Sequence, residues 1–218
     1  MIFGKIDYIN LLPFHVFLKK SSLPNAFKRS CEHQKSVPSA INRKFRKRAV
    51  DAAFISSIES KRTGIKRLNI GIVAQKNVKS VIIKKGEPKS DPASATSNKL
   101  ARVLGLQGEV FIGDRALKLY LESPKTYIDL AQTWHDTYHL PFVFARFCVN
   151  ARHSFYKRLS TQFVRHPIKI PNYILSQYAK ERGITEKNIK EYLKLISYTI
   201  GRKEQKALFM FLKKAKRL

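Results

Sequence analysis

Short apolar runs with strand-like spacing alternate with helix-like patterns along the first part of the chain. Alternation of apolar and polar positions, or a run of β-branched residues, predicts a strand. Four segments fit this description: residues 2–8, 50–55, 68–74 and 78–83. Between the first two, Ile41 and Phe45 lie four positions apart behind Pro38. This arrangement predicts a helix that begins near the proline.

Residues 94–117 are predicted to form an anion-binding helix start followed by a strand. Ser94, Thr96 and Ser97 come directly before apolar residues that share one helical face. A helix N-terminus has free backbone N–H groups and the positive end of the helix dipole. The hydroxyls there can cap the helix or help to hold a carboxylate.

A second strand and helix follow this helix. Residues 109–112 are predicted as a strand, after which Gly113 and Asp114 turn the chain into a helix beginning near Arg115. We expect Asp114 to be the N-cap of this helix, because aspartate is favoured at that position. Contact with a ligand is the alternative role for Asp114.

The rest of the chain is mostly helical in pattern. Residues 127–138 are predicted as a helix and the apolar, aromatic segment 140–148 as a strand. Four further helices are predicted at residues 151–163, 171–182, 185–200 and 203–216. Strands that alternate with helices, followed by terminal helices, indicate an α/β architecture.

Uncharged polar side chains occur at several predicted strand ends and helix starts. Asn10 and Ser56 follow strands, Ser39 lies in the first turn of a helix, and Ser80 is a small polar residue within a strand. Ligands bind beyond the carboxyl ends of strands in open α/β sheets, although Asn10 is also typical of a turn and Ser80 of a tolerated small residue. Together with Thr96 and Ser97, these groups can bind a small anion, but they supply no base.

The chain carries a formal net charge of +28, which allows three interpretations. Basic residues can simply be solvated, they can attract small anions, or they can bind nucleic acid. Lysine and arginine occur in every third of the chain, and no zinc-finger or RNA-binding motif accompanies them. We therefore expect no specific nucleic-acid partner. A hydrophobic content of 44% excludes a disordered chain.

Several other classes of site are not expected. Cys31 and Cys148 lie far apart and are interpreted as ordinary thiols, and His135 and His139 lack a third metal ligand. No GxGxxG, Walker A or GxSxG motif is present. Without a long apolar run or a signal-peptide pattern, we expect a cytoplasmic protein with no membrane insertion.

Seven motifs then identify a resemblance. In chain order they are DYINLLP, VPSAIN, DAAFISS, VKSV, TSNKLARVL, IGDRAL and DLAQTWHDTYHLPFVFA. As an ordered set they resemble the chorismate dehydratases of the futalosine pathway of menaquinone biosynthesis, and the C-terminal segment EYLKLISYTIG is also similar to that family.

The resemblance implies a two-lobe fold of the type II periplasmic-binding-protein kind, with C-terminal helices. Two strands would cross between the lobes, near residues 81–84 and 140–144. Lobe 1 would then comprise residues 1–83 and 141–218, and lobe 2 residues 84–140. The ligand cleft would lie between the lobes.

The resemblance also implies a hydro-lyase that removes water from chorismate to give 3-[(1-carboxyvinyl)oxy]benzoate, without a cofactor. Asn10 and Ser80 are the expected catalytic residues. The expected substrate-binding residues are Ser39, Ser56, Thr96, Ser97 and, second to its capping role, Asp114. The substrate's own enolpyruvyl carboxylate would take the proton. The alternatives are 1,4-dihydroxy-6-naphthoate synthase of the same pathway and a non-catalytic protein that binds small anions.

Overall fold

Two separate β-sheets organise the fold. The computed structural model describes all residues from Met1 to Leu218. The larger sheet has five strands in the order β1 (Phe3–Gly4), β2 (Ala52–Ser56), β7 (Phe142–Val149), β3 (Lys66–Ala74) and β8 (Ile196–Thr199). The smaller sheet has three strands in the order β5 (Gly108–Ile112), β4 (Val81–Lys85) and β6 (Ile128–Asp129).

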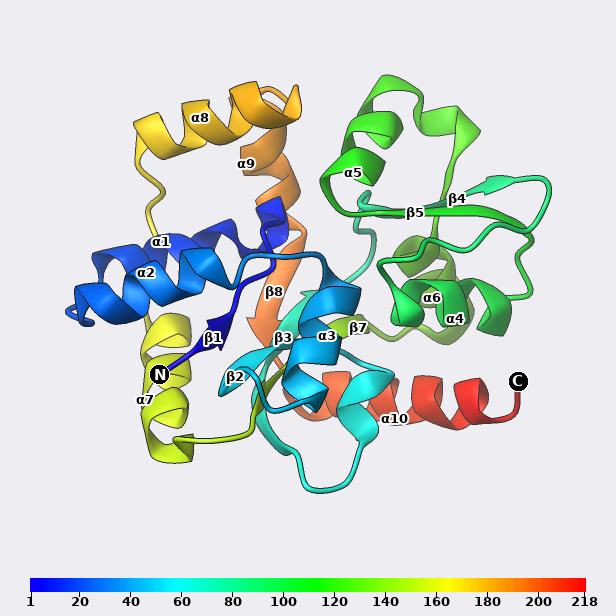
Figure 1. Cartoon of the computed structure of the whole chain (residues 1–218). Coiled ribbons are helices and arrows are strands. Elements are labelled where there is room, and N and C mark those ends of the chain that lie inside the picture. Colours follow the sequence, from blue (N-terminus) through cyan, green and yellow to red (C-terminus); the bar gives the residue numbers. More distant parts are fainter.

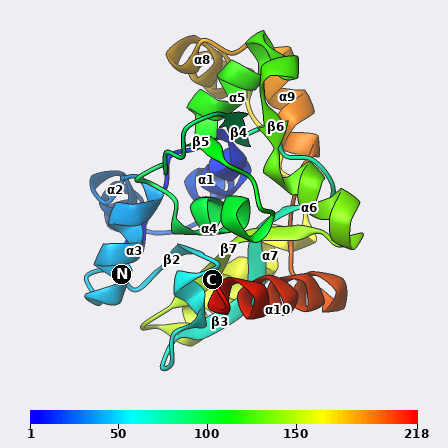
Figure 2. The ribbon, with the colours of Figure 1, turned by 90° about the vertical axis from the view of Figure 1, so that its right-hand side faces the viewer.

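Helices surround both sheets (Figure 1). The α-helices are α1 (Leu12–Lys20), α2 (Asn25–His33), α3 (Pro38–Arg46), α4 (Ala95–Val103), α5 (Gly113–Glu122), α6 (Leu130–Tyr138), α7 (His153–Arg165), α8 (Asn172–Arg182), α9 (Glu186–Lys194) and α10 (Arg202–Lys216). The short 3-10 helices are η1 (Ile9–Leu11), η2 (Glu59–Lys61) and η3 (Pro124–Thr126). Figure 2 shows α5, α8 and α9 at one end of the molecule and α10 at the other. No helix is long and apolar enough to cross a bilayer.

Strand register brings the polar positions of interest together. In the larger sheet β1 pairs with β2 in parallel, and β2 pairs with β7 in antiparallel fashion, with Ser56 opposite Ala145. In the smaller sheet Val81 lies opposite Ile112, so the start of β4 meets the end of β5. The Gly113 N–H donates to the Ser80 carbonyl oxygen at 2.8 Å and extends this pairing.

One hydrophobic core joins the two sheets, since a single cluster of buried side chains contains residues of both. Phe14 of α1 lies near its centre, and its ring centroid is 5.2 Å from that of Phe54 and 5.0 Å from that of Phe163. Burying an aromatic side chain of this size contributes about 1.5–3 kcal/mol. The core therefore fixes the position of α1, and of η1 directly before it, against the larger sheet.

The chain passes between the sheets at residues 75–80 and 139–141. Asp129 anchors the first passage, because its Oδ2 accepts the N–H groups of Val78 at 2.8 Å and Lys79 at 2.6 Å. Its Oδ1 caps α6 by accepting from Ala131 and Gln132. The expected crossing at residues 81–84 is wrong, because β4 lies wholly in the smaller sheet. The limits proposed for the two lobes stay a prediction.

Two other expectations about local structure need correction. The predicted helix 185–200 ends at Lys194, and Ile196–Thr199 forms β8, which pairs with β3 at the edge of the larger sheet. Pairing with the free edge of β3 stabilises a strand at these residues more than their helical pattern stabilises a helix. Helices α1 and α2 were not predicted; α2 buries only Phe27 and Cys31, which leaves a weak apolar pattern.

Candidate active site

A small cavity lies where the two sheets meet. Its walls include side chains of β2, β3 and β7 from the larger sheet and of β4 and β5 from the smaller one, and its volume is about 60 Å³. The polar lining residues are Tyr8, Asn10, Ser56, Ser80, Ser94 and Ser97. All other lining residues are apolar or glycine, so the lining holds no Asp, Glu, His, Lys or Arg.

Asn10 enters the cavity from η1. Its backbone oxygen accepts a hydrogen bond from the Tyr198 hydroxyl at 2.6 Å, which fixes the main chain. Its side-chain Oδ1 is buried and has no hydrogen-bond partner in the protein. Buried polar atoms are nearly always hydrogen-bonded, so this oxygen is available to a donor from outside the chain. A ligand hydroxyl is such a donor.

Ser80 is held by a tyrosine from a distant part of the chain. The Ser80 Oγ lies 2.8 Å from the Tyr192 Oη, and both side chains are buried. Helix α9, which carries Tyr192, packs against η1 and so lies beside Asn10. Burial raises the pKa of Tyr192 although the hydrogen bond with Ser80 opposes the shift, and the phenol therefore stays protonated.

Tyr192 is a residue beside the candidate site that the sequence did not reveal. It falls in a helical pattern where a buried aromatic side chain is ordinary, and its only signal was its place in the segment EYLKLISYTIG. Its hydroxyl fixes the direction of the Ser80 hydroxyl, so we infer that it positions Ser80 rather than acting on a ligand directly. Its contribution is therefore expected in turnover.

The Tyr192→Phe variant is expected to lower kcat about ten-fold and to change KM less than about two-fold, because the hydroxyl that orients the Ser80 and Asn10 side chains is lost while the cavity lining stays intact. Steady-state kinetics with chorismate, the substrate that the resemblance implies, measure both constants. Tyr173→Phe is the control, since Tyr173 is exposed. An unchanged kcat would contradict the positioning role. A fall in kcat that is fully explained by a smaller fraction of folded protein would also contradict it.

The start of α4 supplies two hydroxyls to the cavity. Ser94 is the N-cap, and its Oγ accepts the Ser97 N–H at 3.1 Å and donates to the Ser97 Oγ at 2.8 Å. Both side chains are buried and line the cavity. Thr96 lies outside the lining; its Oγ1 accepts the Ile58 N–H at 3.2 Å and joins α4 to the segment that follows β2.

Ser56 and Ser39 differ in their surroundings. Ser56 is buried in the lining, where the Asn42 Nδ2 donates to its Oγ at 3.0 Å and the Asn42 Oδ1 accepts its N–H at 3.2 Å. Asn42 is a second residue that the sequence did not single out. Ser39 is exposed in the first turn of α3 and does not line the cavity, whereas the adjacent Pro38 does.

Three helices begin at the cavity, which makes it electropositive without any cation. The lining includes Pro38 at the start of α3, the N-cap Ser94 of α4, and Gly113 at the start of α5. Each helix N-terminus carries about half a positive charge on free N–H groups. Gly113 has φ +70°, and a Cβ there would lie 2.7 Å from the Tyr8 ring. Glycine therefore allows Tyr8 to cover the start of α5.

Asp114 lies outside the lining and is not an N-cap. Helix α5 has Ile112 at its N-cap, and Asp114 in the first turn bonds elsewhere. Its Oδ1 accepts the Ile9 N–H at 2.9 Å, and its Oδ2 accepts from the Arg182 Nε at 2.6 Å. The expected capping role is wrong because these two long-range partners hold the carboxylate. Asp114 thus ties α5 to the chain directly before Asn10.

Arg182 extends this link to Asp7. Its Nη2 lies 3.1 Å from the Asp7 Oδ2, which also accepts from Lys35 at 2.6 Å. Burial raises the pKa of Asp7, but the bonds from Lys35 and Tyr178 and the charge of Lys5 outweigh it and lower the pKa to about 2. Asp7 is therefore ionised at neutral pH and holds Arg182 in place.

Comparison with known proteins identifies the family of this chain. The sequence profile of a family described as menaquinone biosynthesis matches residues 1–106 and 93–217. A chorismate dehydratase from Campylobacter jejuni is 51% identical over 220 residues, which cover 100% of this chain and 99% of the relative. The chain belongs to the menaquinone biosynthesis family.

Solved structures place this member of the menaquinone biosynthesis family in a wider fold group. A protein from Archaeoglobus fulgidus has a TM-score of 0.72 at 11% identity and covers 99% of this chain and 96% of its own. A Candida albicans gene product, described as exhibiting the generic periplasmic binding protein fold, has a TM-score of 0.61 at 11% identity over 100% of this chain and 90% of its own. The periplasmic-binding-protein-like fold is therefore confirmed.

Proposed function

We propose that this protein is a chorismate dehydratase of menaquinone biosynthesis, a hydro-lyase that acts in the cytoplasm. Its relative of 51% identity bears that name, and its family is described by that pathway. The observation that carries the proposal is the cavity lining, which combines hydroxyls, one amide and helix N-termini with no charged side chain. Such a lining can bind a substrate dianion and orient it for the elimination of water. It suits a reaction that needs this orientation more than a base from the enzyme.

The reaction removes the C3 proton and the C4 hydroxyl of chorismate. Loss of these groups makes the ring aromatic, so the substrate supplies most of the driving force. Because no lining side chain can act as a base, we assign proton abstraction to the substrate's own enolpyruvyl carboxylate. The electrons of the C3–H bond form the ring double bond, the C4–O bond breaks, and the departing hydroxide takes the abstracted proton to leave as water.

Asn10 and Ser80 act on the leaving group in this proposal. The unpartnered Oδ1 of Asn10 accepts a hydrogen bond from the C4 hydroxyl and orients it. Ser80, directed by Tyr192, donates to the oxygen as negative charge develops on it. Both groups lie at the same wall of the cavity, since α9 packs against η1. Neither residue has to change its protonation state.

The carboxylates are assigned to the hydroxyls and helix starts. Ser94 and Ser97 with the N-terminus of α4 hold one carboxylate, and Ser56 with the N-terminus of α3 faces the other. Thr96 and Asp114 lie outside the lining and act indirectly in this proposal. They accept the backbone N–H groups of Ile58 and Ile9 and so hold the main chain near the cavity. Ser39 is assigned to the rim, where it is exposed beside Pro38.

Substrate entry requires the cavity to open. A volume of about 60 Å³ holds roughly five water molecules, less than a ten-carbon dianion needs. We propose that the two lobes separate about the two passages between the sheets, at residues 75–80 and 139–141, and that β4 moves wholly with the smaller sheet. The substrate then binds in the cleft between the lobes, and closure brings the start of α4 towards Asn10.

The kcat/KM for chorismate is expected to be constant between about pH 6 and pH 9, because no lining group titrates there. Burial, aided by Asp91 and Asp114, raises the pKa of Tyr8 to about 12, and burial also raises that of Tyr192. The substrate carboxylates are ionised throughout this range. A rate profile measured across it checks the expectation; a bell-shaped curve centred near neutrality would reveal an enzyme acid or base and contradict the mechanism.

A comparison of two substrates tests the proposed activity against its alternatives. The purified protein is incubated in parallel with chorismate and with cyclic dehypoxanthine futalosine, the substrate of the naphthoate synthase. Consumption of chorismate alone supports the proposal. Consumption of the futalosine derivative alone would assign the synthase activity, and binding of chorismate without consumption would assign a non-catalytic anion-binding role.

A further inference from the structure

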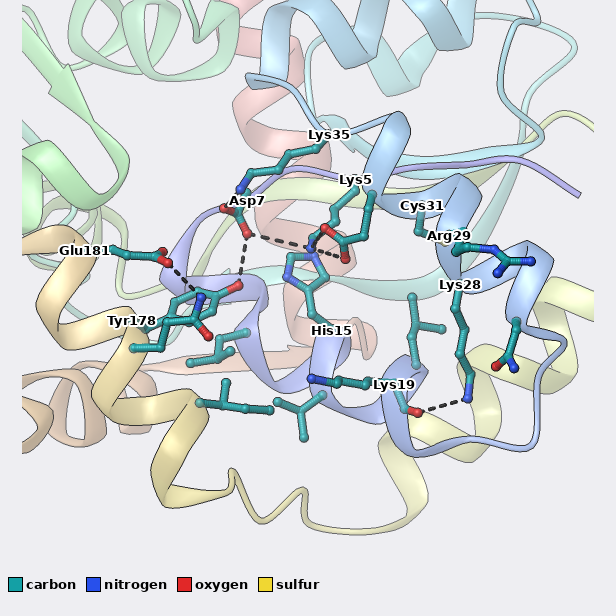
Figure 3. Close-up of a pocket in the computed structure, with 17 residues that line it drawn as sticks. Lys5, Asp7, His15, Lys19, Lys28, Arg29, Cys31, Lys35, Tyr178 and Glu181 are labelled. Carbon is teal, nitrogen blue, oxygen red and sulfur yellow. Dashed lines mark hydrogen bonds and ion pairs between the residues drawn. The ribbon is translucent and has the colours of Figure 1, made fainter.

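A second, larger cavity lies on another face of the molecule. It has a volume of about 600 Å³ and is walled by α1, α2, α8 and the strand region that leads into η1 (Figure 3). None of its lining residues lines the first cavity. The reaction proposed above makes no use of it.

His15 of α1 is the unusual group in this cavity. Both of its ring nitrogens are buried, and neither has a hydrogen-bond partner in the protein. Burial and the charge of Lys5 lower the pKa of His15 to about 3, so the ring is neutral and offers one donor and one acceptor. Figure 3 shows the ring in the middle of the cavity, between the groups around Asp7 and the basic end. Two unsatisfied nitrogens at such a position indicate a missing partner.

The charges of the lining do not cancel. Its three carboxylates are already engaged: Glu32 with Lys5 at 2.6 Å, Asp7 with Lys35 at 2.6 Å, and Glu181 with Arg182 at 2.9 Å. The lining also contains Lys19, Lys28 and Arg29, and none of these makes an ion pair. Lys28 and Arg29 lie at one end of the cavity, whereas the Lys19 ammonium lies over the Tyr173 ring (Figure 3). The cavity therefore carries three positive charges without a negative partner, and two of them lie at its basic end.

The floor between these polar groups is apolar. It is formed by Leu12, Val16, Leu18 and Ile174, and the Tyr178 ring adds an aromatic side. A bare inorganic anion would leave this surface in contact with water only. A ligand with an apolar body would bury it, which is favourable by about 25 cal/mol per Å².

We propose that this cavity is a second binding site, for a small organic anion with a flat apolar body. Its acidic group lies against Lys28 and Arg29, its body covers the apolar floor, and a polar atom bonds to His15. The site is separate from the dehydratase cavity, and its occupation does not depend on the proposed reaction.

Binding of benzoate, read from the ring signals of His15 by NMR, tests the proposal. The signals are assigned by their absence from a His15→Gln variant. Benzoate is expected to shift them in a saturable manner, while acetate, which lacks the body, and benzyl alcohol, which lacks the charge, bind about ten-fold more weakly or not at all. The titration is repeated in the Asn10→Ala variant, where the same result is expected because the sites are separate.

Charge reversal distinguishes direct binding from an effect transmitted from the first cavity. The Lys28→Glu/Arg29→Glu double variant is expected to weaken benzoate binding at least about ten-fold. The matched control is Arg202→Glu/Lys206→Glu on α10, where both side chains are exposed, and it should bind as the unmodified protein does. Unshifted His15 signals, equal binding by the two double variants, or equal binding of all three probes would overturn the proposal.

Discussion

The Asn10→Ala variant is expected to lower kcat/KM for chorismate by roughly 10²-fold, because the C4 hydroxyl loses the hydrogen bond that orients it for departure. The side-chain Oδ1 of Asn10 is buried and unpartnered in the free protein. Its removal leaves no protein donor unpaired at this oxygen and costs only the side-chain hydrogen bond between Asn10 and Tyr192, so the thermal midpoint should fall only slightly. Steady-state kinetics and a thermal melt measure the two quantities.

A control separates the role of Asn10 from general effects of amide loss. Asn69 is exposed on β3, outside the cavity, so Asn69→Ala should keep both the activity and the melting temperature. Full kcat/KM in Asn10→Ala would remove Asn10 from the mechanism. A loss of activity together with a large fall in the melting temperature would instead give it a structural role.

The Arg182→Leu variant is expected to lower the free energy of unfolding by about 3 kcal/mol, because it leaves Asp114 nearly buried without a partner for its Oδ2. The Arg182, Asp7 and Asp114 side chains are only 11%, 13% and 16% exposed, so water compensates little. Asp7 retains Lys35. Urea unfolding measures the change.

The matched control for this prediction is Arg158→Leu, since Arg158 is exposed on α7. It should unfold at nearly the same urea concentration as the unmodified protein. A double variant that also carries Asp114→Asn should recover part of the stability lost in Arg182→Leu, because the uncompensated charge is gone. Equal stability of Arg182→Leu and Arg158→Leu would show that the ion pair does not join α8 to α5.

The parts of the site that depend on local pattern could be predicted from the sequence. Asn10 lies in η1 beyond β1, Ser56 is the last residue of β2, and Ser97 lies in the first turn of α4, whose apolar face is regular. Their polar character at those positions was enough to place them in one cavity once an α/β fold was expected. Ser94, whose hydroxyl is predicted to cap the helix or help to hold a carboxylate, is both the N-cap of α4 and part of the lining.

The parts that depend on long-range contacts could not be predicted. Tyr192 lies 112 positions from Ser80, and Arg182 lies 68 positions from Asp114, so no spacing relates them. The same reason explains Asp114, whose position after Gly113 favours a cap but whose partners come from η1 and α8. β8 likewise follows from the free edge of β3, which the helical pattern of its own residues does not reveal.

The central claim is that this chain eliminates water from chorismate. The most direct test is incubation of the purified protein with chorismate, followed by mass spectrometry and proton NMR of the product. The account predicts a compound lighter by one water molecule with an aromatic ring and an intact enolpyruvyl group. Unchanged chorismate, or a rearranged isomer of the same mass, would contradict it.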